Sequence, residues 1–174
     1  MANSRPRTCQ LVRENASPWF LPLNGEWDFH LAHKPEDVPA DFTQPGFDPA
    51  GRDAWMKLPV PGNWTLHGTF DKPHYTNVQM PFPDEPPRVP EQNPTGCYRT
   101  ILNLPESWRD RRIVLHFGGA ESVLYVHVNG TPVGMSKDSR LPSEFDITPY
   151  VTVGQKNVIS AVVIKYSDAT FIED

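Results

Sequence analysis

Residues 122–136 are SVLYVHVNGTPVGMS, two strand-like runs on either side of Asn129 and Gly130. Side chains alternate along 122–128, which places Val123, Tyr125 and His127 on one face of a predicted strand. Asn-Gly between two such runs is the strongest short-range signal for a β-hairpin, because both residues tolerate the positive φ that a tight turn needs. We therefore predict a hairpin centred on Asn129 and Gly130.

The sequence on both sides of this hairpin also has β character. Residues 157–166 (NVISAVVIKY) are rich in β-branched side chains and predict a central strand. Residues 98–104 and 112–117 predict two further strands, 153–156 a turn, and 107–110 a short helical turn. Strand signals recur about every 8–12 residues, a spacing typical of a β-sandwich or barrel.

The first half of the chain has fewer strand signals. Residues 24–30 predict a strand with Trp27 and Phe29 facing inward. Residues 55–61 predict another, which its two prolines restrict to a sheet edge. Since no stretch keeps a helical periodicity beyond a turn or two, the chain is predicted to be all-β.

Proline is the compositional anomaly. The chain has 20 prolines in 174 residues, about twice the average usage. Within 79–95 they are Pro81, Pro83, Pro86, Pro87, Pro90 and Pro94. We predict one long, stiff, non-regular loop there, and loops of that length within a compact domain usually have a function.

Length and charge limit the classes of protein to which this chain can belong. A chain of 174 residues predicts one domain. With 16 basic and 21 acidic residues the net charge is −5, which argues against a nucleic-acid partner. The N-terminus has no secretory signal, and the longest apolar stretch, 158–164, is far too short to span a bilayer. We interpret Cys9 and Cys97 as free thiols in a reducing cytoplasm rather than a bridge.

Catalytic motifs are weak in this sequence. Gly118 and Gly119 lack the spacing of a phosphate-binding loop. His30 and His33 have neither a helix nor a neighbouring glutamate, as a zinc hydrolase would require. A glycosidase needs two carboxylates, but those at 144 and 146 are better explained as a solvated strand face. We predict no catalytic residue and no cofactor in this chain.

One segment resembles a sugar-binding surface. Aromatic and imidazole rings gather beside Asn77, namely Trp64, His67, Phe70, His74 and Tyr75. Aromatic faces stack on sugar rings, and amides bind sugar hydroxyls. The alternative is that these rings pack under the loop as a satellite of the core.

Several strings occur together and in order. They are LNGEW (23–27), PVPGNW (59–64), PHYTNV (73–78), NPTGCY (93–98), DSRLPSEFD (138–146) and YSDATFIED (166–174). Together they resemble the N-terminal sugar-binding domain of glycoside hydrolase family 2, and specifically its large β-galactosidases. The resemblance covers residues 19–174, after an N-terminal extension of residues 1–18.

The resemblance implies a fold and an architecture. It implies a jelly-roll β-sandwich, similar to galactose-binding domains, that packs on a catalytic TIM barrel. The acid/base and nucleophile glutamates of these enzymes lie in that barrel, and no position here corresponds to them. Because the family's sequence continues beyond Asp174, we expect the chain to be one domain of a longer enzyme.

The resemblance also assigns a few residues. Asn77 matches an asparagine that contacts the galactosyl group, and Val78 is its neighbour at the site. Asp168 matches an aspartate that helps to bind a peripheral structural magnesium ion, and the parent enzymes also use sodium. Lys137 stands where the family has glutamine, and the N-terminal segment is shortened. We therefore predict no metal site in this chain.

The resulting hypothesis is a non-catalytic N-terminal domain of a retaining β-galactosidase, which supplies Asn77 and Val78 to one wall of the galactose subsite. Its partners would be the downstream domains and the galactoside, with no nucleic acid and no membrane. A free-standing carbohydrate-binding module and a purely architectural domain are the alternatives. Exposure of the face that meets the barrel predicts weak self-association of the isolated chain.

Overall fold

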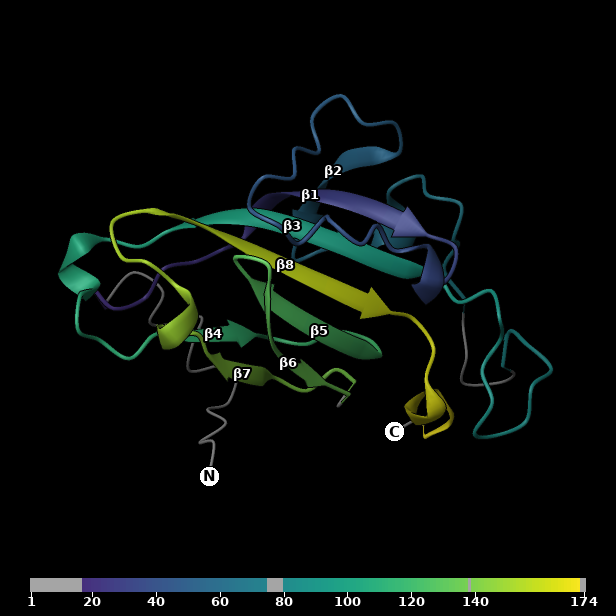
Figure 1. Ribbon diagram of the computed structural model, residues 1–174. Coiled ribbons are helices and arrows are strands. Elements are labelled where there is room, and N and C mark those ends of the chain that lie inside the picture. The colour runs from purple at the N-terminus through teal and green to yellow at the C-terminus, as the bar shows by residue number, and fades with distance from the viewer. Residues whose placement is uncertain (1–16, 75–79, 138, 173–174) are drawn as a thin grey trace.

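The computed structural model describes residues 17–74, 80–137 and 139–172 (Figure 1). Its strands are β1 (Gly25–Ala32), β2 (Trp55–Val60), β3 (Thr95–Asn103), β4 (Val114–Phe117), β5 (Val123–Val128), β6 (Thr131–Ser136), β7 (Ser143–Asp146) and β8 (Lys156–Ile164). Its helices are short 3-10 turns: η1 (Pro35–Asp37), η2 (Trp64–Leu66), η3 (Glu106–Trp108), η4 (Thr148–Tyr150) and η5 (Asp168–Phe171). The prediction of an all-β chain is confirmed.

The strands form two antiparallel sheets. The larger has the order β2-β1-β3-β8-β5-β6, and the smaller pairs β4 with β7. The predicted central strand is β8, which lies between β3 and β5. The predicted edge strand is β2, and the opposite edge strand is β6. Each of them contains one proline, Pro59 in β2 and Pro132 in β6. A proline donates no backbone hydrogen bond, which is tolerated at a sheet edge.

The main core lies between the two sheets. Phe29 of β1 and Leu58 of β2 are fully buried, and Trp27 is nearly so, as predicted for the inward face of 24–30. From the other side, Leu115 of β4 and Phe145 of β7 join the same cluster. The predicted jelly-roll β-sandwich is therefore confirmed.

The predicted hairpin joins β5 to β6. Asn129 and Gly130 both have positive φ, 51° and 82°, as a two-residue turn of this type requires. The Asn129 side chain also accepts a hydrogen bond from the backbone N–H of Val158 at 2.8 Å, which ties the turn to β8. On β5, the residues that enter the main core are Leu124, Val126 and Val128, so the face shared by Tyr125 and His127 is the outer one.

A long segment, residues 33–54, covers part of the outer face of the large sheet (Figure 1). Phe42 and Phe47 pack there on Cys97, whose neighbour Tyr98 faces the main core instead. Cys97 is a buried free thiol, and burial raises its pKa to about 12.

One buried arginine fixes this covering segment. Arg99 of β3 is only 4% exposed, and its guanidinium donates to the carbonyl oxygens of Phe42, Pro45 and Phe47 at 3.0–3.2 Å. Burial lowers the pKa of Arg99, while the nearby carboxylates of Asp28 and Asp48 act in the opposite direction. All three hydrogen bonds go to backbone oxygens, so they depend on the path of the chain and not on the side chains at residues 42, 45 and 47.

Candidate functional site

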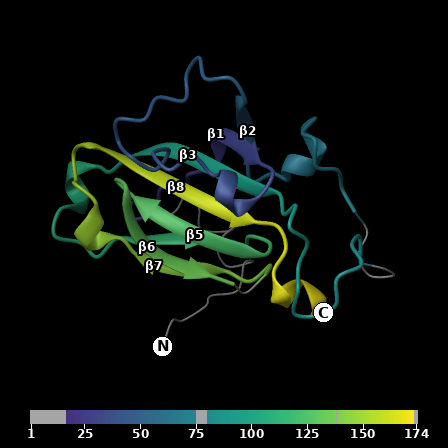
Figure 2. The ribbon, with the colours of Figure 1, turned by 45° about the vertical axis from the view of Figure 1, so that its right-hand side comes forward.

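The predicted proline-rich loop lies at one end of the sandwich, where the chain leaves β2 and later enters β3 (Figure 2). In its described part, residues 80–94 contain neither helix nor strand, as predicted. The loop ends one residue earlier than predicted, because Thr95 already belongs to β3. The C-terminal segment with η5 lies beside this loop (Figures 1 and 2).

We call residues 61–94, which connect β2 to β3, the loop region. A buried carboxylate anchors its first half. Asp71 is 7% exposed and accepts a hydrogen bond from the indole N–H of Trp64 at 2.7 Å. The ammonium group of Lys165, the residue that follows β8, contacts both oxygens of the same carboxylate at 2.6 and 2.7 Å. The Lys165 side chain is itself only 16% exposed, so this pair is largely shielded from water. A buried charge needs such a partner, and removal of either one is costly.

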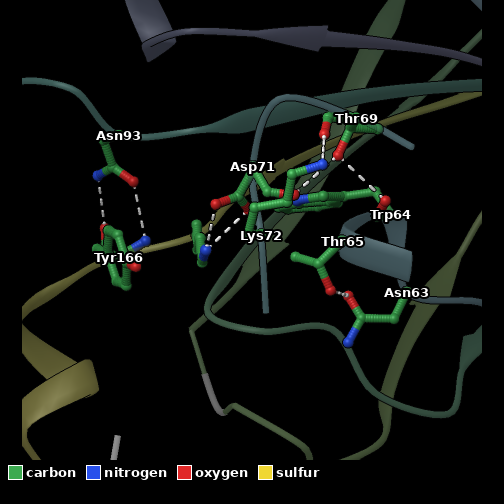
Figure 3. A network of polar contacts seen from close by, with 9 residues as sticks. Asn63, Trp64, Thr65, Thr69, Asp71, Lys72, Asn93 and Tyr166 are labelled. Atoms are coloured by element: carbon green, nitrogen blue, oxygen red, sulfur yellow. Dashed lines mark hydrogen bonds and ion pairs between the residues drawn. The ribbon is translucent and has the colours of Figure 1, made fainter. Parts of the chain in front are cut away.

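A buried amide anchors the other side. Asn93 donates from Nδ2 to the carbonyl oxygen of Tyr166 and accepts from the Tyr166 backbone N–H at Oδ1, both at 2.9 Å (Figure 3). The ring of Tyr166 also meets Phe82 edge-on, with the ring centroids 4.9 Å apart. The chain between β2 and β3 is thus tied, both before and after residues 75–79, to the segment that follows β8.

The partners of these two anchors, Lys165 and Tyr166, belong to one short segment, residues 165–168, which we call the clasp. Its four consecutive residues contact four distant parts of the chain: Lys165 with Asp71, Tyr166 with Asn93, Ser167 with Ser122, and Asp168 with Lys137. Ser167 also caps η5, because its hydroxyl accepts from the backbone N–H of Ala169. The clasp therefore fixes the arrangement of this end of the sandwich.

The two predicted sugar-contacting residues, Asn77 and Val78, lie outside the described residues, and so does Tyr75. Among the other rings of that prediction, Trp64 is buried, in agreement with the packing alternative, but it belongs to the main core and not to a satellite of it. Phe70 is 48% exposed and stacks on His33, with the ring centroids 4.1 Å apart.

The aspartate assigned to a magnesium site is already paired. The Asp168 carboxylate contacts the Lys137 ammonium, and this hydrogen bond is the main reason why the pKa of Asp168 is lowered. A lysine ammonium has no lone pair to offer a metal ion. Among the described residues, no group of three or more His, Cys, Asp or Glu side chains could hold a metal. The side chains at Asp168 therefore do not fit a divalent cation.

The two carboxylates of β7 form a solvated strand face, as predicted. Both are exposed; Glu144 contacts Nδ1 of His116 at 3.3 Å. Asp146 accepts hydrogen bonds from Thr148 and from Arg112, which lower its pKa to about 2. A general acid needs a raised pKa instead, so the environment of Asp146 disfavours that role.

A hollow in the described part of the structure lies elsewhere. It has a volume of about 830 Å³, is open to solvent, and is lined by residues 109–113, 146 and 148–153. No residue of the clasp or of the proline-rich loop lines it.

In the described part of the chain, no helix is long and apolar enough to cross a membrane.

Sequence reasoning missed the pair between Asp71 and Lys165. These residues are 94 positions apart, and neither stands in a pattern that predicts burial. The one available signal was that Asp71 lies within a segment rich in aromatic side chains.

The fold and the clasp define a β-sandwich domain in which Asp71 and Asn93 anchor the chain between β2 and β3. Residues 20–174 match the family described as glycosyl hydrolases family 2, sugar binding domain. The chain belongs to this family, as its sequence strings predicted.

Similar proteins agree with this assignment. A β-galactosidase from Vibrio cholerae is 47% identical over 168 residues, which are 97% of this chain and 16% of that protein. A β-galactosidase from Psychromonas ingrahamii is 45% identical over 91% of this chain and 15% of its own length. The chain thus spans about one sixth of these relatives.

Solved structures share the fold. A β-glucuronidase from Bifidobacterium dentium superposes with a TM-score of 0.61 at 21% identity, over 82% of this chain and 20% of that one. A β-glucuronidase from Ruminococcus gnavus gives a TM-score of 0.58 at 22% identity, over 82% of this chain and 21% of that one. At this identity the likeness supports the fold alone.

Proposed function

We propose that this chain is the N-terminal, non-catalytic domain of a β-galactosidase and that it supplies one wall of the galactose subsite. The observation that carries the proposal is the 42–47% identity to β-galactosidases over most of the chain. The clasp supports it, because it holds the chain on both sides of the segment that contains Asn77.

In this proposal the domain positions substrate and performs no bond chemistry. The amide of Asn77 would bind a sugar hydroxyl, and Val78 would pack beside it. Retaining hydrolysis needs two carboxylates about 5 Å apart, which the downstream TIM barrel would supply. Contacts that orient a substrate raise the rate although they take no part in the chemistry. Magnesium and sodium would belong to the complete enzyme.

The decisive test is Asn77→Ala in the enzyme that contains the downstream domains. We expect kcat/KM for a chromogenic β-galactoside to fall about 10–100-fold, because a hydrogen bond worth about 1–3 kcal/mol is lost. Asn63→Ala is the matched control, since Asn63 is an exposed amide of the same loop region. Unchanged kinetics for Asn77→Ala would favour the purely architectural alternative.

A second measurement uses the chain alone. Isothermal titration with galactose and lactose, beside a hydrolysis assay on the same sample, should show neither binding at millimolar sugar nor turnover. Clear binding without turnover would favour the free-standing carbohydrate-binding module. Hydrolysis above the buffer blank would contradict a non-catalytic domain.

A further inference from the structure

The outermost contact of the clasp joins two segments that are otherwise apart in the chain. Lys137 directly follows β6, and Asp168 is the first residue of η5. Their ion pair is about half-exposed on both sides. The same Asp168 oxygen, Oδ1, also accepts a hydrogen bond from the backbone N–H of Ala169 at 3.0 Å. The carboxylate thus links the end of β6 to the start of η5.

A second ion pair lies beside the Asp168–Lys137 pair. Beside the Asp168–Lys137 pair, the carboxylate of Glu121 contacts the Arg140 guanidinium at 3.3 Å. Between these two pairs, the hydroxyl groups of Ser122 and Ser167 are 2.9 Å apart in a buried hydrogen bond. Asp168 and Glu121, two acidic residues that the structure describes at this corner, are thus each paired with a cation of the polypeptide.

We propose that the Lys137 ammonium is the built-in cation of this corner and takes the place that the family resemblance gives to a divalent metal ion. The fold of this chain consequently does not depend on magnesium at Asp168. The inference concerns the stability of the domain and is independent of its proposed role toward a sugar.

The chemistry of the two side chains supports this substitution. Magnesium is bound by oxygen atoms in an octahedral arrangement. A glutamine at position 137 would offer its carbonyl oxygen to such an ion, whereas lysine offers three N–H donors and no acceptor. A positive charge already on the Asp168 carboxylate also repels an approaching dication. Lysine and magnesium are therefore alternatives at this corner, and the sequence provides lysine.

Thermal unfolding of the full chain tests the proposal. The midpoint is measured in EDTA and in millimolar MgCl₂, with NaCl added to match the ionic strength. We expect the two midpoints to agree within about 1 °C, because the site that would bind the ion is occupied. Lys137→Gln should lower the midpoint by about 1–3 °C, the effect of an exposed ion pair in a chain of this size.

A double-mutant cycle separates this contact from a general change of surface charge. We expect Lys137→Gln and Asp168→Asn to have non-additive effects, so that the double variant is little worse than either single variant. Lys57→Gln is the control, because the exposed Lys57 pairs with the partly buried Asp28 on β2 and β1, at the other side of the large sheet from β6. Combined with Asp168→Asn, this control should give additive effects.

Two results would overturn the proposal. One is a rise of more than about 2 °C in the midpoint of the unmodified chain with magnesium that Asp168→Asn abolishes. The other is strict additivity of Lys137→Gln and Asp168→Asn. Neither result bears on galactoside kinetics, so a failure here leaves the proposed function intact.

Discussion

The large sheet and the loop region at its end are stabilised in different ways. The sheet rests on a continuous apolar core to which β1, β2, β3, β5 and β8 all contribute. The loop region depends on a few polar contacts that converge on the clasp, chiefly at Asp71 and Asn93. The stability of the sheet is thus spread over many buried side chains, whereas the arrangement of the loop region depends on one or two.

The largest effect is expected in the sheet. Phe29→Ala removes a fully buried ring and should lower the free energy of unfolding by about 3–5 kcal/mol, because a cavity remains. Urea denaturation measures this loss. Phe70→Ala, at a ring that is 48% exposed, is the control and should cost less than about 1 kcal/mol. Equal losses for the two variants would remove the distinction between core and loop.

The next effect is expected in the loop region. Asp71→Asn keeps an acceptor for Trp64 but leaves the Lys165 ammonium without its counter-charge, which should cost about 2–3 kcal/mol. Hydrogen exchange should quicken in residues 63–74 and 80–94 and stay slow in β3 and β8.

Asp41→Asn is the matched control for this variant, because Asp41 faces Arg52 at 3.8 Å in an exposed pair. It should leave both stability and exchange nearly unchanged. Faster exchange throughout β3 and β8 in Asp71→Asn would show instead that sheet and loop unfold as one cooperative unit.

The smallest effect is expected in the β4–β7 sheet. Hydrogen bonds from Thr148 and Arg112 hold the pKa of Asp146 at about 2, below its usual 3.8. A lowered folded-state pKa stabilises the protein above the unfolded-state value, and this contribution disappears as the pH falls from about 4 to 2.

Thermal midpoints between pH 5 and pH 2 test this dependence. At pH 5 the midpoint of the unmodified chain should be slightly higher than that of Asp146→Asn. The two midpoints should converge as the pH falls toward 2. Asp53→Asn, at an exposed position, is the control. A difference that stays constant across this range would exclude titration of Asp146 as its cause.

Much of the sheet was predictable from the sequence, because its signals are local. Asn129 and Gly130 determine a turn by their own conformational preferences, and Trp27 and Phe29 mark the inward face of β1. The proline-rich loop was predictable for the same reason. The family strings also predicted the sandwich that the structure shows.

The contacts at the candidate site were not predictable, because they join residues that are far apart in the chain. No local pattern around Lys165 indicates that its partner is Asp71. On β5, alternation showed that Tyr125 and His127 share a face, but apolar residues on both faces left open which one enters the core. Asn77 and Val78 remain predictions.

The contacts of Arg99 have a consequence for how freely the covering segment can diverge among relatives. Because the guanidinium binds the carbonyl oxygens of residues 42, 45 and 47, any amino acid there presents the same acceptors. Substitutions at Pro45 should therefore accumulate with little loss of stability. Insertions that move these carbonyl oxygens should be removed by selection. Lysine cannot replace the planar, five-donor fork of arginine at position 99. Amino-acid changes at the exposed Pro45 and changes of length within residues 42–47 should consequently be under unequal selection, while Phe42 and Phe47 are also constrained by their packing on Cys97.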